Sequence, residues 1–208
     1  LTPLSKGWCT DLGVELASTA VQVHGGMGFI EETGVGQYYR DARILPIYEG
    51  TNGIQALDLV GRKLSLQGGA PVKALFGEMD ATVKALAATG DEMAAMSLQL
   101  NLAVSALKEA TNWLYSNAPN DPHAAPAGAT PYLRMFATTV GGYLLAKSAL
   151  KAREMRTVGD ADTAFLDAKI VTARFFMAQI LPMATALLGP VTEGAETLFA
   201  IDDAQLSA

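Results

Sequence analysis

Apolar residues recur every three or four positions through most of the chain, which is the spacing of one face of an α-helix. This pattern predicts an all-α fold with helices over about 2–24, 35–44, 51–64, 71–88, 91–116, 132–158 and 160–181. The first helix carries an apolar stripe made of Trp8, Leu12, Leu16, Ala20 and Val23. A longer stripe, expected to lie in the core, consists of Met93, Met96, Leu100, Val104, Leu107, Thr111 and Leu114. In the last long helix the buried stripe is expected to be Leu166, Ile170, Ala173 and Met177.

Capping residues predict where several of these helices begin. The hydroxyl of Thr2 is expected to cap the first helix, with Pro3 at its first helical position. Thr51 is expected to open the third helix, and Asp160 to cap the last long one.

A glycine-rich segment at 65–71 predicts a linker between two helical units. Residues 1–64 then form part of one helical domain, and residues 71–208 form a second, in which four long helices with short connections make a bundle. The composition is 50% hydrophobic but only 7% aromatic, which favours packed helices over a β-sandwich. Only 17% of the residues are charged, so we expect part of the surface to be covered, by an oligomer or by further protein.

Charge and cysteine usage narrow the class of protein. A net charge of −6 without any basic run argues against a nucleic-acid-binding surface. Charges or glycines are expected to interrupt every apolar stretch before it reaches the roughly 20 residues of a membrane span. Cys9 is the single cysteine, which excludes an internal disulfide, and no signal peptide is evident, so we expect a cytoplasmic protein. His123 has no cysteine or histidine neighbour, so no metal site is expected.

Residues 22–55 hold the features that indicate chemistry. Glu49 follows a largely apolar segment and precedes Gly50 and a helix start, so its carboxylate is expected to be partly desolvated. Desolvation favours a general base that works near neutral pH. The alternative is that Glu49 merely ends a turn in solvent.

Glycines 25, 26 and 28 suggest a second function, because bare backbone can turn sharply and present N–H groups to phosphate oxygens. The GxGxxG spacing of dinucleotide-binding folds is absent. A glycine-rich helix end is the structural alternative. His24, just before the glycines, is expected to be packed or hydrogen-bonded.

Three motifs follow in order: QVHGGMGF at 22–29, YRDAR at 39–43 and IYEGT at 47–51. Together they closely resemble the C-terminal domain of flavin-dependent acyl-CoA dehydrogenases. Ion pairs that hold the turn at Glu49 are expected from Arg40, Asp41 and Arg43.

The resemblance implies that Glu49 is the base that removes the α-proton of an acyl-CoA thioester, while the β-hydrogen leaves as hydride to N5 of FAD. Contacts with the thioester substrate are implied for Tyr48 and Gly50. FAD contacts reached from a neighbouring subunit, and hence a homo-oligomer, are implied for Gln22, Val23, His24, Gly25 and Gly26. Near the base, the implied FAD contacts are Thr51, Asn52 and Gly53. At Gly53 many relatives have glutamine, and Asn52 is its expected substitute.

Residues 71–208 resemble the additional helical domain of a subgroup that includes long-chain bacterial and methylthiopropanoyl-CoA dehydrogenases. These enzymes carry two further domains before this point, and the first residue is Leu1, so we expect the C-terminal portion of a longer enzyme. Electrons would pass from FAD to an electron-transfer flavoprotein. Two alternatives stay open: an acyl-CoA oxidase, which returns the electrons to oxygen, and a helical assembly module whose glutamate has no catalytic role.

Overall fold

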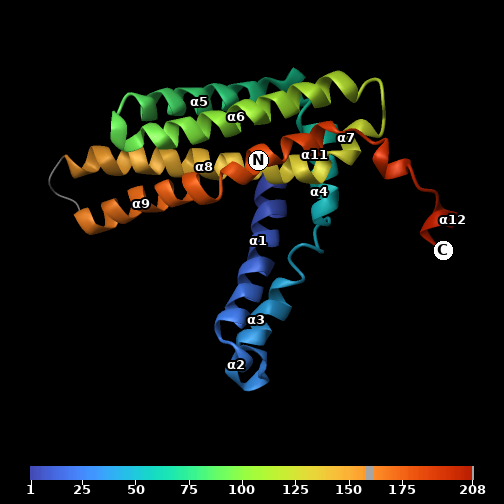
Figure 1. Ribbon diagram of the computed structural model, residues 1–208, viewed down its shortest axis with the longest axis horizontal. Coiled ribbons are helices and arrows are strands. Elements are labelled where there is room, and N and C mark those ends of the chain that lie inside the picture. Colours follow the sequence, from blue (N-terminus) through green and yellow to red (C-terminus); the bar gives the residue numbers. More distant parts are fainter. Residues whose placement is uncertain (158–161, 208) are drawn as a thin grey trace.

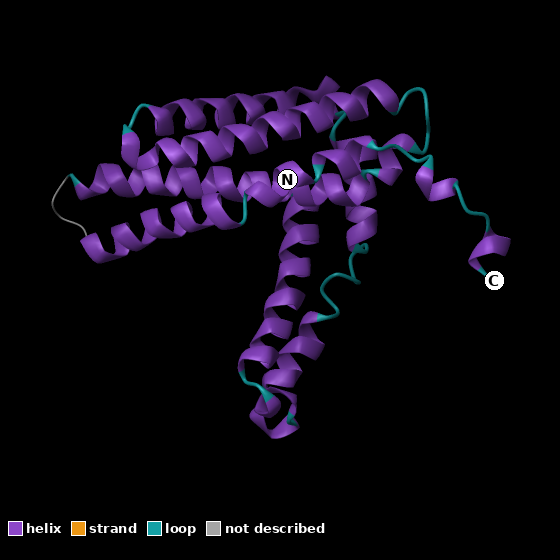
Figure 2. Ribbon diagram, in the orientation of Figure 1, coloured by secondary structure: helices purple, strands orange, loops and turns teal. Residues whose placement is uncertain are grey.

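The structure is a computed structural model that describes residues 1–157 and 162–207. Within these residues the chain forms helices and connections and no strand (Figure 2), which confirms the all-α prediction. The elements of the first part are α1 (Thr2–Val23), α2 (Gly26–Phe29), η1 (Glu31–Thr33), α3 (Val35–Ala42), α4 (Asn52–Asp58), the π-helical turn η2 (Leu59–Lys63) and η3 (Leu66–Gly69). The remaining elements are α5 (Ala70–Ala87), α6 (Asp91–Asn117), α7 (Ala124–Ala127), α8 (Ala129–Arg156), α9 (Thr163–Gln179), α10 (Pro182–Ala186), α11 (Leu188–Thr192), η4 (Thr197–Phe199) and α12 (Asp203–Leu206).

Four long helices, α5, α6, α8 and α9, lie side by side and are called the bundle (Figure 1). The arm, formed by α1, α2 and α3, projects away from the bundle with α2 at its tip. Both α1 and α4 contact α8. A Cβ atom at Gly141 of α8 would lie 3.0 Å from the ring of Trp8, so bare backbone lets α1 approach there. Buried Leu4 and Leu59 join one core with the bundle, which is therefore continuous across the predicted linker.

The core of the bundle follows the predicted helical spacing. All seven residues of the stripe on α6 are at most 3% exposed. The predicted stripe on α9 is also buried, and α9 packs on α8. These helices confirm the sequence prediction because each has neighbours within the described chain on the side that its apolar residues face.

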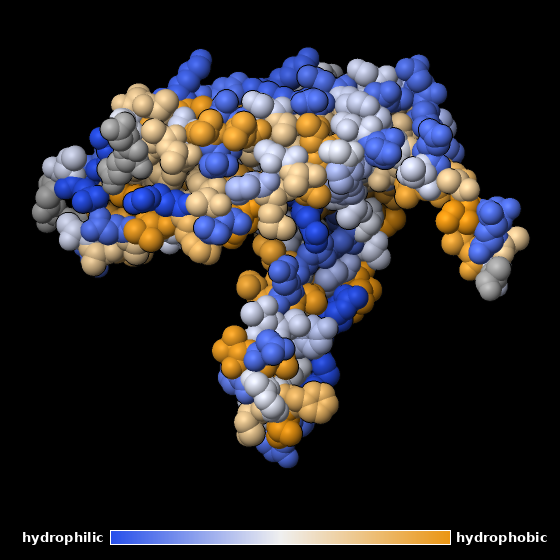
Figure 3. Space-filling view, viewed as in Figure 1, coloured by the Kyte–Doolittle hydropathy of each residue, from blue (hydrophilic) through white to orange (hydrophobic). Residues whose placement is uncertain are grey.

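The apolar stripe of α1 is not buried along its whole length. Leu16 and Val23 are 65% and 79% exposed, although the helix ends within one residue of its predicted limit. Among the described residues, α1 packs on α2 and α3 in the arm and on α4 and α8 nearer the bundle, and these neighbours leave much of its surface in the arm uncovered. Apolar atoms therefore gather on the surface of the arm (Figure 3).

Of the helix caps predicted from the sequence, the structure confirms Thr51 and contradicts Thr2. The side chain of Thr51 caps α4, since its Oγ1 accepts a hydrogen bond from Ile54 N at 3.3 Å. Thr2 does not cap α1, because it already lies inside the helix and Leu1 takes the cap position. The predicted cap Asp160 lies outside the described residues, and Asp162 caps α9.

One described segment, Thr163–Thr192, is long and apolar enough to cross a membrane by length and composition. As the sequence predicts, charges and a glycine do interrupt it: the longest run without either, residues 175–188 between Arg174 and Gly189, is shorter than the roughly 20 residues of a membrane span. In the fold this segment comprises α9, α10 and α11, with a break before Pro182. Mostly buried core helices pass the same test, whereas 28% of this window is buried, including one stripe of α9 that packs on α8.

Tyr132 of α8 has its hydroxyl buried against α6. Thr111 Oγ1 lies 2.8 Å from it and donates its own hydrogen to Leu107 O at 2.7 Å, so Tyr132 is the donor. We expect Thr111→Val to lower the free energy of unfolding by about 1–3 kcal/mol, because the buried phenol hydrogen loses its acceptor. Tyr132→Phe should cost less, since Thr111 keeps its bond to Leu107. Urea denaturation checks this order, and an equal or reversed cost would contradict the donor direction.

The same burial has a consequence at alkaline pH. Desolvation by burial raises the pKa of Tyr132 above its ordinary value of about 10. Because the folded state holds this proton more tightly, stability is full below about pH 10 and falls as the pH rises further. We expect the free energy of unfolding, measured from pH 8 upward, to fall more steeply above about pH 10 in the unaltered chain than in Tyr132→Phe.

Candidate functional site

The turn between α3 and α4 places Glu49 in an unusual backbone conformation. Ile47 N and Tyr48 N both donate to Ile44 O, and Asn52 N donates to Pro46 O at 3.1 Å, which closes the turn. Inside it, Glu49 has φ of 53°. A non-glycine residue in the left-handed region costs about 1–2 kcal/mol, and such strain persists where surrounding contacts hold it.

Gly50 follows with φ of 81°, so two successive residues are left-handed. Glycine accepts this conformation without a steric cost. Within the part of the chain that the structure describes, no hydrogen bond occupies the backbone N–H groups of Glu49, Gly50 and Thr51. The turn therefore offers consecutive N–H donors beside a carboxylate.

Side chains from two helices hold the carbonyl groups of this turn. Lys6 Nζ of α1 donates to Gly50 O at 2.8 Å. Gln55 Nε2 of α4 donates to Glu49 O at 3.2 Å. Both peptide planes next to Gly50 are thereby oriented.

Asn52 ties the turn to α1. Its Oδ1 accepts from Lys6 Nζ at 2.7 Å, and its Nδ2 donates to Asp11 Oδ1 at 2.6 Å and to Gly7 O at 3.0 Å. Thr10 Oγ1 lies 2.9 Å from the same Nδ2. We call Lys6, Thr10, Asp11 and Asn52 the clamp. The two hydrogens of the amide are taken by α1, so the FAD contact expected from the Asn52 side chain is not supported by this geometry.

Glu49 itself is exposed, so the expected partial desolvation is not met within this chain. Tyr48, predicted to contact substrate, is also exposed, at 46%. Among the described residues, the side-chain hydrogen bonds to Glu49 and Gly50 come from α1 and α4 and end on their carbonyl oxygens, so the carboxylate stays exposed. Glu49, Gly50, Tyr48, Thr51 and Gly53 are brought together by the turn, as their adjacency in sequence requires.

The predicted FAD contacts at the end of α1 lie at the tip of the arm. Gln22, Val23, His24 and Gly26 are exposed there, and Gly25 has φ of 58° as α1 gives way to α2. Nδ1 of His24 donates to Ala20 O at 2.8 Å, which confirms that this histidine is hydrogen-bonded.

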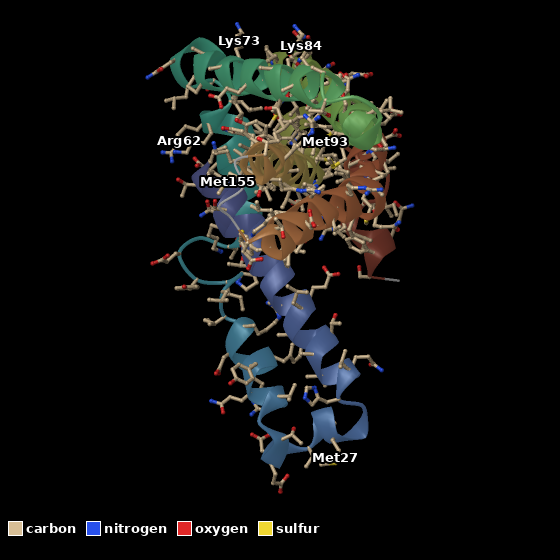
Figure 4. All side chains as sticks on the ribbon, turned by 90° about the vertical axis from the view of Figure 1, so that its left-hand side faces the viewer. Met27, Arg62, Lys73, Lys84, Met93 and Met155 are labelled. Carbon is tan, nitrogen blue, oxygen red and sulfur yellow. The ribbon has the colours of Figure 1, made fainter. Side chains whose placement is uncertain are left out.

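The structure does not bring the two predicted halves of the site together. Lys6 contacts the turn and Gln22 lies sixteen residues further along the same helix, a separation of roughly 24 Å at 1.5 Å per residue. Figure 4 shows Met27, which lies between Gly26 and Gly28, at the far end of the arm. One copy of the chain therefore presents two separate surfaces.

The sequence prediction chose the wrong ion pairs for the turn and missed Lys6. Arg40 forms a bidentate pair with Glu31 at 2.6 and 3.1 Å, near the tip of the arm. No ion pair of Asp41 or Arg43 occurs among the described residues. Lys6 is the only lysine or arginine before Arg40, and this isolation was the signal that could have drawn attention to it.

Two family models cover most of the chain. The model described as "Acyl-CoA dehydrogenase, C-terminal domain" matches residues 1–64, and "Acetyl-CoA dehydrogenase C-terminal like" matches residues 75–202. The chain belongs to the acyl-CoA dehydrogenase family. The motif resemblance is thereby confirmed, and the turn at Glu49 lies inside the first of the two matched domains.

Relatives within this family extend beyond the chain. It is 44% identical to 3-methylmercaptopropionyl-CoA dehydrogenase of Ruegeria pomeroyi over 95% of its own length and 34% of that protein. It is 33% identical to a butyryl-CoA dehydrogenase of Syntrophomonas wolfei over 86% of its length and 30% of that protein. A subunit of the caffeyl-CoA reductase–Etf complex of Acetobacterium woodii is 39% identical over 29% of the chain and 16% of its own length. The chain thus spans about a third of the length of the first two relatives.

Proposed function

We propose that this chain provides the catalytic base of an FAD-dependent enzyme that converts acyl-CoA thioesters into 2,3-enoyl-CoA. The observation that carries the proposal is the left-handed turn at Glu49 and Gly50, where a carboxylate and unpaired backbone N–H groups are presented together. It occurs in a chain of the acyl-CoA dehydrogenase family. In this reaction Glu49 is the base, and Tyr48 and Gly50 contact the thioester.

The chemistry requires both features of the turn. The carboxylate of Glu49 takes the α-proton, and the electrons of the C–H bond move into the thioester to give an enolate-like oxygen. A backbone N–H beside the base donates to that oxygen, and removing one such donor typically costs about 3–4 kcal/mol of transition-state stabilisation. Gly50 lets the thioester approach the backbone because it has no side chain. The acyl chain and the protein surfaces around it exclude water from the exposed carboxylate once substrate binds.

FAD, when bound, accepts the β-hydrogen as hydride. The tip of the arm suits its diphosphate and ribose portion, since a Cβ atom at Gly25 or Gly26 would meet no other atom within 4 Å. Bare backbone, Gln22 and His24 are then accessible to a ligand there. Thr51 and Gly53 are the residues we assign to FAD near the base.

Two surfaces at opposite ends of α1 support a homo-oligomer in which the base of one copy works with FAD held partly by another. The arm also exposes apolar side chains that such an assembly would cover, among them Val23, Met27, Phe29 and Tyr38. We propose an electron-transfer flavoprotein as the acceptor of the electrons, prompted by the relative named as part of an Etf complex. The cytoplasm is the proposed compartment.

The test uses the protein encoded by the whole open reading frame, purified with its flavin. We expect the visible FAD absorbance to bleach without oxygen when acyl-CoA is added. The panel should include the 3-methylmercaptopropionyl and butyryl thioesters after which two relatives are named. Hydrogen peroxide formed in step with substrate would identify an oxidase. A protein without flavin, or a flavin that no thioester bleaches, would contradict the proposal.

A further inference from the structure

The clamp holds the backbone of the turn that carries Glu49, which an ordinary contact between surface side chains does not do. Lys6 Nζ bridges Gly50 O and Asn52 Oδ1, at 2.8 and 2.7 Å, and these two groups lie on either side of Thr51. Both are more than forty residues from Lys6 along the chain. A cation from α1 therefore fixes the carbonyl of the left-handed glycine that follows Glu49.

Other groups of α1 hold the side-chain amide of Asn52. Asp11 and the carbonyl of Gly7 accept from the amide of Asn52, and Thr10 lies within hydrogen-bond distance of it. These three groups and Lys6 come from two successive turns of α1, a continuous helix that packs against α8 of the bundle. The turn is thus fastened to a rigid element.

We propose that Lys6 is a positioning residue that keeps Glu49 and Gly50 left-handed and so directs the carboxylate and the adjacent N–H groups toward the thioester. This inference rests on the function proposed above. A non-glycine residue in the left-handed region relaxes toward more favourable angles unless its surroundings prevent it. A misplacement of about 1 Å at a reacting group can cost about a hundredfold in rate. Lys6 touches neither reacting atom, and it acts through Gly50 and Asn52.

The main test is Lys6→Met in the flavin-loaded protein encoded by the whole open reading frame. At saturating acyl-CoA we expect the rate constant of flavin reduction to fall about 10- to 100-fold, while the half-saturating concentration changes by about twofold or less. Lys6→Arg, which can still donate to both oxygens, should recover the rate to within about fivefold. Lys73→Met, which removes an exposed lysine of α5, is the matched control and should leave the rate unchanged.

Hydrogen exchange gives a readout that does not depend on catalysis. In Lys6→Met the amide of Asn52, which is bonded to Pro46 O, should exchange faster together with those of Ile47 and Tyr48. Amides in the buried part of α6 should keep their rates. Lys6→Arg should restore the slow exchange in the turn.

Two results would overturn the inference: flavin reduction in Lys6→Met within about twofold of the unaltered enzyme, or faster exchange spread evenly over arm and bundle. If Lys6→Met does not fold, Asn52→Ala replaces it, since this variant removes one of the two oxygens that Lys6 bridges and the amide bonds to Gly7 and Asp11, while Thr51 still caps α4. A rate about 10-fold lower would support the inference, and an unchanged rate would overturn it. Failure of the proposed function is recognised separately, because it would show as unimpaired flavin reduction in Glu49→Gln while the exchange effect of Lys6→Met persists.

Discussion

Replacing Glu49 by glutamine is expected to slow the reduction of FAD by acyl-CoA by about 10³-fold or more. Glutamine has nearly the same shape and leaves the turn, its clamp and its backbone N–H groups in place, but its amide does not accept the α-proton. The loss should therefore appear in the chemical step and leave substrate binding nearly unchanged. Anaerobic stopped-flow spectroscopy of the flavin, in the protein encoded by the whole open reading frame, measures it directly.

Glu109→Gln is a suitable control for that experiment. Glu109 is an exposed residue of α6, far along the chain from the turn, and the same change there should leave flavin reduction as it was. Near-normal reduction in Glu49→Gln would remove the catalytic assignment. The turn would then have only a structural role, as in the helical assembly module that the sequence left open.

The largest effect on stability is expected in the core of the bundle. Leu107 of α6 is fully buried, and Leu107→Ala should lower the free energy of unfolding by about 2–5 kcal/mol, through lost apolar burial and the cavity that remains. Leu98→Ala makes the same change on the same helix at a side chain that is 58% exposed, and should cost about 0.5 kcal/mol or less. Urea denaturation followed by circular dichroism compares the two. Similar losses in both variants would contradict the assignment of this face of α6 to the core.

The bundle could be predicted from sequence because its burial is decided by helical spacing. The residues of α6 from Met93 to Leu114 point to one side, and α5 and α8 lie close by to receive them. The cap at Thr51 was equally accessible, since a threonine before a helix bonds to an N–H three residues ahead. Such features depend on neighbours within a few residues.

The site could be predicted only in part, because its remaining features depend on distant residues or on surfaces outside the described chain. Glu49 was expected to be desolvated from the apolar residues before it, yet those residues do not cover it in the fold. The prediction that the apolar stripe of α1 is buried was wrong at Leu16 and Val23 for the same reason. Lys6 was missed because its partners stand more than forty residues away, where no local pattern indicates them.

The helix α1 is a rigid spacer between the turn at Glu49 and the glycines at the tip of the arm. It is clamped to the turn near one end and gives way to the glycines at the other, so its length and phase set how the two ends face each other. Adding or deleting one residue in its middle would rotate one end by about 100° and shift it by about 1.5 Å. Substitutions on the surface of α1 leave this register intact, whereas a change in its length breaks it even when every residue at both ends is kept.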